Sequence, residues 1–109
     1  MSGLRRDHMI IYNVTTQVNN NIHDTWLEWM KNEHIPEVLA TGLFTHHRML
    51  RLIEVDESEG PTYAIQYFTT LKEKYDLYLE LHANELRAKT LQKWGDQIFS
   101  FRSLMEVVE

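Results

Sequence analysis

Residues 26–42, WLEWMKNEHIPEVLATG, contain the pattern around which the rest of the fold can be placed. Trp26 and Trp29 recur at helical spacing, which is typical of the buried face of a helix. Pro36 disfavours helical geometry at the residue before it, so we expect the helix to kink near His34 and to continue for a short second turn. The stretch is therefore predicted to form the first helix and one wall of any small-molecule site.

Strand-type segments rich in β-branched and aromatic residues lie on both sides of this helix. They predict strands at residues 9–18, 44–55, 62–69 and 97–108. A second helix is expected to open with a capping box of Thr70 and Glu73 and to run to about Trp94, with an interruption near Asn84. The order β-α-β-β-α-β is the ferredoxin-like arrangement. Right-handed crossovers then place both helices on one face of a four-stranded antiparallel sheet, an α+β fold.

Apolar residues alternate onto both faces of the predicted sheet. In the last strand Phe99 and Phe101 point one way, while Ile98 and Leu104 point the other. A sheet with one face in water should show cleaner alternation, and a bare apolar face would be a large exposed patch. A second copy packed face to face would cover it, so we predict a homodimer that encloses a barrel-like interior about a two-fold axis.

Length and composition indicate a single globular domain at residues 9–109, preceded at residues 1–8 by a polar stretch that we interpret as a vector-derived leader. The formal charge of −5 argues against nonspecific nucleic-acid binding. The absence of cysteine excludes disulfides and thiolate chemistry. No apolar run approaches the ~20 residues of a membrane span. We therefore expect a cytoplasmic protein without nucleic-acid or membrane partners.

No motif in the chain predicts a metal or a cofactor. His23 and His34 lie eleven residues apart, which is ~16 Å along a helix axis and too far to share an ion. His46 and His47 are neighbours in a strand and point to opposite faces. There is no nucleophile elbow, glycine-rich phosphate loop or dinucleotide fingerprint.

Four segments together resemble a known family. They are MIIYNVT at 9–15, W-x-x-W-M-x-x-x-HIPEVLATG at 26–42, TYAIQY at 62–67 and GDQIFSFRSLMEV at 95–107. The resemblance is to an uncharacterised bacterial family of short dimeric α+β-barrel proteins, classed as a domain of unknown function. It implies the fold and the dimer but no reaction. More distantly, the chain is similar to the wider dimeric α+β-barrel superfamily, which includes cofactor-independent monooxygenases and muconolactone isomerases; none of their active residues aligns here.

Several polar residues are candidates for a site. His34 has an ordinary pKa suited to proton transfer, although it could instead cap the helix end or bond to a backbone carbonyl. Asn13 and Gln66 lie in central strands, where such residues need partners, and Arg102 lies in the neighbouring strand. Facing one pocket, these groups would bind the polar end of a ligand; otherwise they would form a hydrogen-bond network between subunits.

Trp29 and Tyr67 complete the candidate ligand-binding set, as aromatic walls for a small apolar or aromatic ligand, with a place in the core as their alternative. The sequence therefore favours a homodimeric small-molecule-binding protein. One alternative is a cofactor-independent monooxygenase or isomerase, in which His34 moves a proton while Asn13 or Gln66 holds an oxyanion. Another is a structural or interaction module without a ligand. Whether the protein is an enzyme is left open by the sequence.

Overall fold

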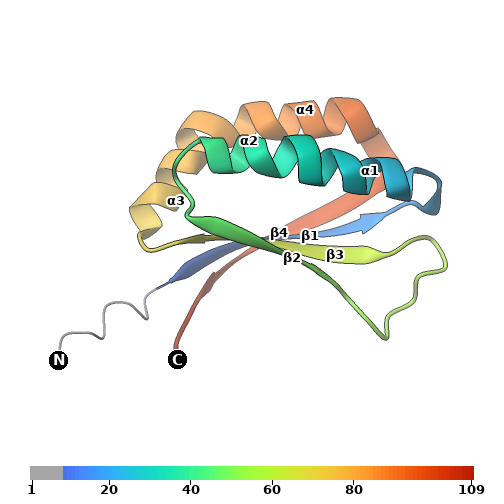
Figure 1. Cartoon of the computed structure of the whole chain (residues 1–109), viewed down its shortest axis with the longest axis horizontal. Helices are drawn as coiled ribbons and strands as arrows, with labels where there is room; N and C mark the ends of the chain where they lie inside the picture. Colours follow the sequence, from blue (N-terminus) through green and yellow to red (C-terminus); the bar gives the residue numbers. More distant parts are fainter. Residues whose placement is uncertain (1–8) are drawn as a thin grey trace.

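A computed structural model describes residues 9–109 as an antiparallel sheet covered on one face by two helical segments (Figure 1). The strands are β1 (Ile10–Val18), β2 (His46–Arg51), β3 (Thr62–Thr69) and β4 (Ile98–Glu106). Their spatial order is β2-β3-β1-β4, and each neighbouring pair is antiparallel. This topology confirms the predicted ferredoxin-like fold. The predicted leader at residues 1–8 lies outside the described residues.

Each helical segment consists of two α-helices joined by a π-helical turn. The first is α1 (His23–Trp29), the turn Met30–His34 and α2 (Ile35–Ala40); the second is α3 (Lys72–Tyr78), the turn Leu79–Ala83 and α4 (Asn84–Trp94). Short 3₁₀ turns at Asn20–Ile22 and Gly95–Gln97 join the helices to the strands. The irregularity predicted near His34 takes the form of a π turn without a break in the helical segment, since Ile35 keeps helical geometry at a φ of −59° and a ψ of −45°. Pro36 falls in the first turn of α2, where its missing N–H is tolerated.

Two local predictions were wrong. The capping box does not form: the N-cap of α3 is Leu71, in an extended conformation and without a side-chain cap, and its N–H is donated to Thr69 Oγ1 at 3.4 Å. The second strand is also shorter than residues 44–55. Phe44 packs in the core before β2 begins, and Glu54 adopts a φ of 58°, which ends extended geometry after β2.

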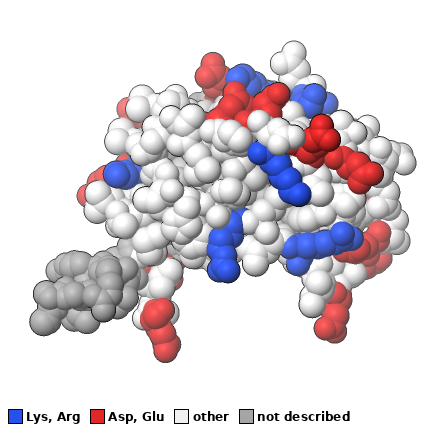
Figure 2. Space-filling view, viewed as in Figure 1, with Lys and Arg blue, Asp and Glu red and all other residues white. Residues whose placement is uncertain are grey.

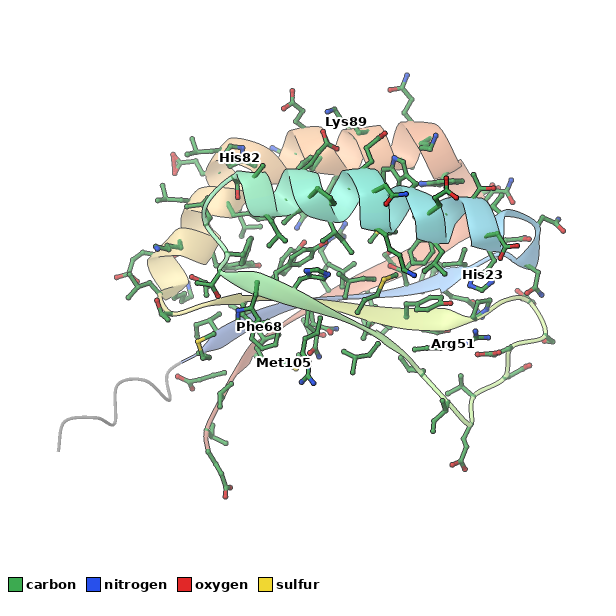
Figure 3. All side chains as sticks on the ribbon, viewed as in Figure 1. His23, Arg51, Phe68, His82, Lys89 and Met105 are labelled. Carbon is green, nitrogen blue, oxygen red and sulfur yellow. The ribbon has the colours of Figure 1, made fainter. Side chains whose placement is uncertain are left out.

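The two faces of the sheet differ in what covers them. On β3, Tyr63, Ile65 and Tyr67 are buried beneath the helices, where Trp26 is only 1% exposed. The residues between them face the other way, as Phe68 does in Figure 3. We call this second side the open face. Its residues follow from the strand register: Ile11, Asn13, Thr15, Gln17, His46, Arg48, Leu50, Thr62, Ala64, Gln66, Phe68, Phe99, Phe101, Ser103 and Met105.

Candidate functional site

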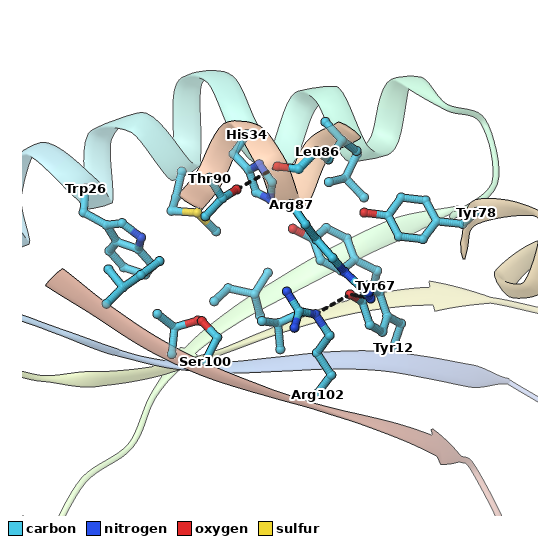
Figure 4. Close-up of a pocket in the computed structure, with 16 residues that line it drawn as sticks. Tyr12, Trp26, His34, Tyr67, Tyr78, Leu86, Arg87, Thr90, Ser100 and Arg102 are labelled. Carbon is cyan, nitrogen blue, oxygen red and sulfur yellow. Dashed lines mark hydrogen bonds between the residues drawn. The ribbon is translucent and has the colours of Figure 1, made fainter. Parts of the chain in front are cut away.

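A cavity of about 50 Å³ lies between the helix layer and the sheet (Figure 4). Residues of β1, β3, β4 and both helical segments line it. Its apolar walls are Val14, Trp26, Met30, Val38, Ile65, Leu86 and Ile98. Its polar and aromatic lining is Tyr12, Thr16, His34, Tyr67, Tyr78, Arg87, Thr90, Ser100 and Arg102. Trp26 lies at one side of the group, apart from Arg87 and Arg102, which lie beside Tyr12 (Figure 4). We call the part of the cavity around these two arginines the cationic end.

Two arginines from different elements meet at one phenol oxygen. Arg87 of α4 donates from Nη2 to Tyr12 Oη at 3.1 Å, and Arg102 of β4 donates from Nε to the same oxygen at 3.2 Å. Neither guanidinium forms an ion pair with a carboxylate of residues 9–109. Because Tyr12 Oη accepts both bonds, its own hydrogen remains available to a third group.

Buried tyrosines surround this cationic end. The Tyr12 ring lies 5.9 Å from that of Tyr67 and 5.7 Å from that of Tyr78, centroid to centroid. Burial raises the pKa of Tyr67 and of Tyr78, so both hydroxyls stay protonated near neutral pH. For Tyr78, the nearby Tyr12 adds to the rise in pKa, whereas Arg87 and Arg102 oppose it. Both cations therefore act electrostatically on this part of the cavity.

His34 is held by its aromatic neighbour. Its ring stacks on Trp29 with centroids 4.8 Å apart, and Trp29 Nε1 donates to Glu33 at 2.8 Å. Burial lowers the pKa of His34, although Glu37 and Glu33 partly oppose this shift. The imidazole is therefore neutral at pH 7, the form that can accept a proton.

Two buried nitrogens of cavity-lining residues have no hydrogen-bond partner in the described part of the chain. They are His34 Nδ1 and Arg87 Nε. Buried polar atoms in folded proteins are nearly always paired, because an unsatisfied group costs about 1–3 kcal/mol. Because both residues line the cavity, unsatisfied polar groups of the described chain gather around it.

The structure brings together only part of the predicted site. His34, Tyr67 and Arg102 line the same cavity, and Trp29 packs behind His34 without lining it. Asn13 and Gln66 lie directly opposite each other on β1 and β3, but on the open face. Within one subunit, the sheet separates them from His34.

On the open face, Asn13 and Gln66 belong to a polar row that crosses all four strands. Arg48 lies opposite Gln66, and Ser103 lies opposite Asn13. Asn13 is 7% exposed and its amide donates to Thr15 Oγ1 at 2.9 Å. These residues therefore contribute to the surface that is predicted to meet the second subunit.

Sequence reasoning missed Tyr12, Tyr78 and Arg87. For Tyr12 a signal was present, since it alternates with Asn13 along β1 and must face the helices if Asn13 does not. For Arg87 there was none, because the π turn at Leu79–Ala83 inserts a residue and rotates the following part of the helix.

Charges elsewhere on the surface are mixed. Figure 2 shows acidic and basic side chains interspersed over the helix layer. Lys89 pairs with Glu37 at 3.0 Å, and Arg51 pairs with Glu57 at 2.8 Å. Within residues 9–109, no three His, Asp or Glu side chains gather where they could hold a metal ion. No helix in this part of the chain has the length and apolar character needed to cross a bilayer.

These features define an α+β protein of the ferredoxin-like class with a small, partly apolar cavity beneath its helices. The family model for a domain of unknown function, DUF4286, matches residues 9–108, and the chain belongs to this family. A solved structure described as a dimeric ferredoxin-like protein from an uncultured marine organism is similar, with a TM-score of 0.70 and 12% identity. The match covers 94% of this chain and 97% of the other. No curated protein matches the chain.

Proposed function

We propose that the protein is a homodimer that binds a small molecule in the cavity between its helices and its sheet. The proposal rests on two nitrogens, His34 Nδ1 and Arg87 Nε, which have no hydrogen-bond partner among residues 9–109 and belong to residues that line a partly apolar cavity. Because Arg102 is exposed and Arg87 is half-buried, a ligand would have access from the β4 side of the sheet. The cytoplasmic bacterial location expected from the sequence stays a prediction.

The size of the cavity favours a ligand smaller than the aromatic one expected from the sequence. Drug-sized ligands occupy pockets of roughly 300–1,000 Å³, whereas this cavity measures about 50 Å³. One water-sized group needs about 10–15 Å³ on this measure, so the space suits roughly three to five non-hydrogen atoms. Tyr67 and Trp26 then enclose the ligand and need not stack on an aromatic ring.

The open face supports the proposed dimer. Apolar side chains on it are substantially exposed, including Phe99 at 69% and Phe101 at 55%. The polar row through Gln66 and Asn13 lies between Phe99 and Phe101 on one side and Phe68 on the other. A second copy related by a two-fold axis would cover the apolar groups and give the polar row hydrogen-bonding partners. The similar solved structure is described as dimeric.

A catalytic role for His34 is the second candidate function. It is favoured by the lowered pKa of His34, by the place of its ring in the cavity lining, and by Nδ1, which has no partner among residues 9–109. In such a reaction His34 would accept a proton as a neutral base. Any developing negative charge would lie near Arg87 or Arg102, since Asn13 and Gln66 face away. A substrate screen that compares the wild type with His34→Ala tests this role, and equal turnover would remove it.

Binding in the cavity is tested by screening small fragments by saturation-transfer NMR against two variants of α4. Thr90→Met places a larger side chain in the lining, whereas Ala88→Met changes an exposed position on the same helix. We expect Thr90→Met to abolish the signal of fragments that bind the wild type and Ala88→Met to preserve it. Fragment signals that survive Thr90→Met unchanged would contradict the proposed site.

A further inference from the structure

The cationic end of the cavity has hydrogen-bond donors in excess of acceptors. Arg87 and Arg102 each use a single N–H on Tyr12 within the described residues. Guanidinium groups carry only donors, and Tyr12 Oη has accepted two bonds and can still donate one. No carboxylate of residues 9–109 lines the cavity. A ligand that binds at this end must therefore bring acceptors.

The two arginines also carry like charges, which favours a ligand that is an anion. Their donor nitrogens both lie within 3.2 Å of one oxygen, so they repel each other across a half-buried site. The chain as a whole is acidic, with 16 Asp and Glu against 11 Lys and Arg. Three other cations pair with carboxylates: Arg51 with Glu57, Lys72 with Asp76 and Lys89 with Glu37. Two arginines that have no carboxylate partner among residues 9–109 and lie beside a cavity are thus a local excess of positive charge, for which an anion is the complement.

The apolar part of the lining restricts which anion fits. Val14 lies directly opposite Arg102 in the strand register, and Ile65 lies next to Val14. Together with Ile98 and Trp26 they offer apolar contact and no charge. Inorganic phosphate is strongly hydrated, and placing it against these apolar walls would cost desolvation energy. A carboxylate with a short aliphatic tail would place its charge at the arginines and its tail against the apolar walls, within the space of roughly three to five non-hydrogen atoms.

We infer that the ligand is a short-chain carboxylate whose acid group lies between Arg87 and Arg102 beside Tyr12. This inference rests on the proposed small-molecule site and specifies its ligand class. Bidentate pairing with a guanidinium suits the planar carboxylate, and the Tyr12 hydroxyl hydrogen adds a donor. The neutral His34 ring contributes a further polar group to the lining without adding a third charge.

Titrations monitored by backbone amide NMR test the inference with three probes: propionate, its neutral isostere propionamide, and inorganic phosphate. We expect propionate to shift resonances of the cavity lining and to bind at least about tenfold more tightly than propionamide, as charge-assisted hydrogen bonds imply. Arg102→Gln and Arg87→Gln should each weaken propionate binding about tenfold or more. The control Arg51→Gln, at an exposed ion pair away from the cavity, should stay within about twofold of the wild type.

The outcomes separate this inference from the proposed function. If propionamide binds in the cavity as tightly as propionate, or if phosphate alone binds, the carboxylate inference fails while the small-molecule site stands. Propionate affinity that is unchanged in both Arg87→Gln and Arg102→Gln, with native amide dispersion, overturns the inference as well. If no probe shifts the lining resonances and no fragment binds there, the proposed function fails together with the inference.

Discussion

Substituting Phe101 by Asp should dissociate the proposed dimer. Phe101 is 55% exposed in the single subunit and lies on the open face, paired with Thr15 of β1. A phenylalanine side chain has about 150–250 Å² of surface, so the interface would cover roughly 80–140 Å² of it. At about 25 cal/mol per Å² this burial contributes about 2–3.5 kcal/mol per subunit. The two-fold axis doubles the effect.

Only part of this energy becomes affinity, because association also orders side chains and desolvates polar groups. We therefore expect Phe101→Asp to raise the dimer dissociation constant at least about a thousandfold, or about 4 kcal/mol. Sedimentation velocity over a concentration series measures the change. Leu91→Asp is the matched control, since Leu91 is 68% exposed but lies on α4, away from the open face. A Phe101→Asp protein that dimerises as well as Leu91→Asp would refute the assignment of the interface.

Three further predictions concern stability. Gly60 has a φ of 144°, and Gly60→Ala would place a Cβ 1.7 Å from the carbonyl oxygen of Val18. The free energy of unfolding, measured with urea, should therefore fall by roughly 3 kcal/mol or more. A fall of less than about 1 kcal/mol would contradict this packing. Trp26→Ala removes a side chain that is 1% exposed and should lower the unfolding free energy by about 3–5 kcal/mol, whereas a loss under about 1 kcal/mol would place Trp26 outside the core. Because burial holds the pKa of His34 below its ordinary 6.5, its neutral ring contributes stability that is present above pH 6.5 and lost as the pH falls through the folded-state pKa. The difference between the unfolding free energies at pH 7.5 and pH 5.5 should be smaller in His34→Gln than in the wild type. An equal difference in the two proteins would argue against the lowered pKa of His34.

The fold could be predicted from the sequence because strand alternation, helical spacing and turn residues all indicated the same order of elements. The alternation through β3, with Tyr63, Ile65 and Tyr67 on one side, identified the strand. Apolar residues on both sides left open which face the helices cover, and the structure shows that it is the face of these three residues. Gly95, at a φ of 56°, ended the second helical segment where expected. The errors lay at element ends, where a local hydrogen bond such as Leu71 N–H to Thr69 Oγ1 replaced the expected cap.

The site could be predicted only in part because it depends on which way side chains point. Asn13 and Tyr12 are adjacent in β1, and a shift of one residue exchanges their faces. Arg87 comes close to Tyr12 across 75 positions of sequence, through the packing of α4 on the sheet. His34 and Arg102 were identified from their chemistry, but the phenol that links the two arginines follows only from the three-dimensional arrangement.

The most direct test of a carboxylate site beneath the helices is a titration of ¹⁵N-labelled protein with propionate. The measured quantities are the chemical shifts of the arginine side-chain Nε–H groups. Arg87 and Arg102 should shift together with one dissociation constant, because the ligand contacts both guanidinium groups. Arg48 on the open face and Arg51 in its ion pair with Glu57 should not move. Stationary Arg87 and Arg102 signals, or equal shifts at all four arginines, would contradict the account.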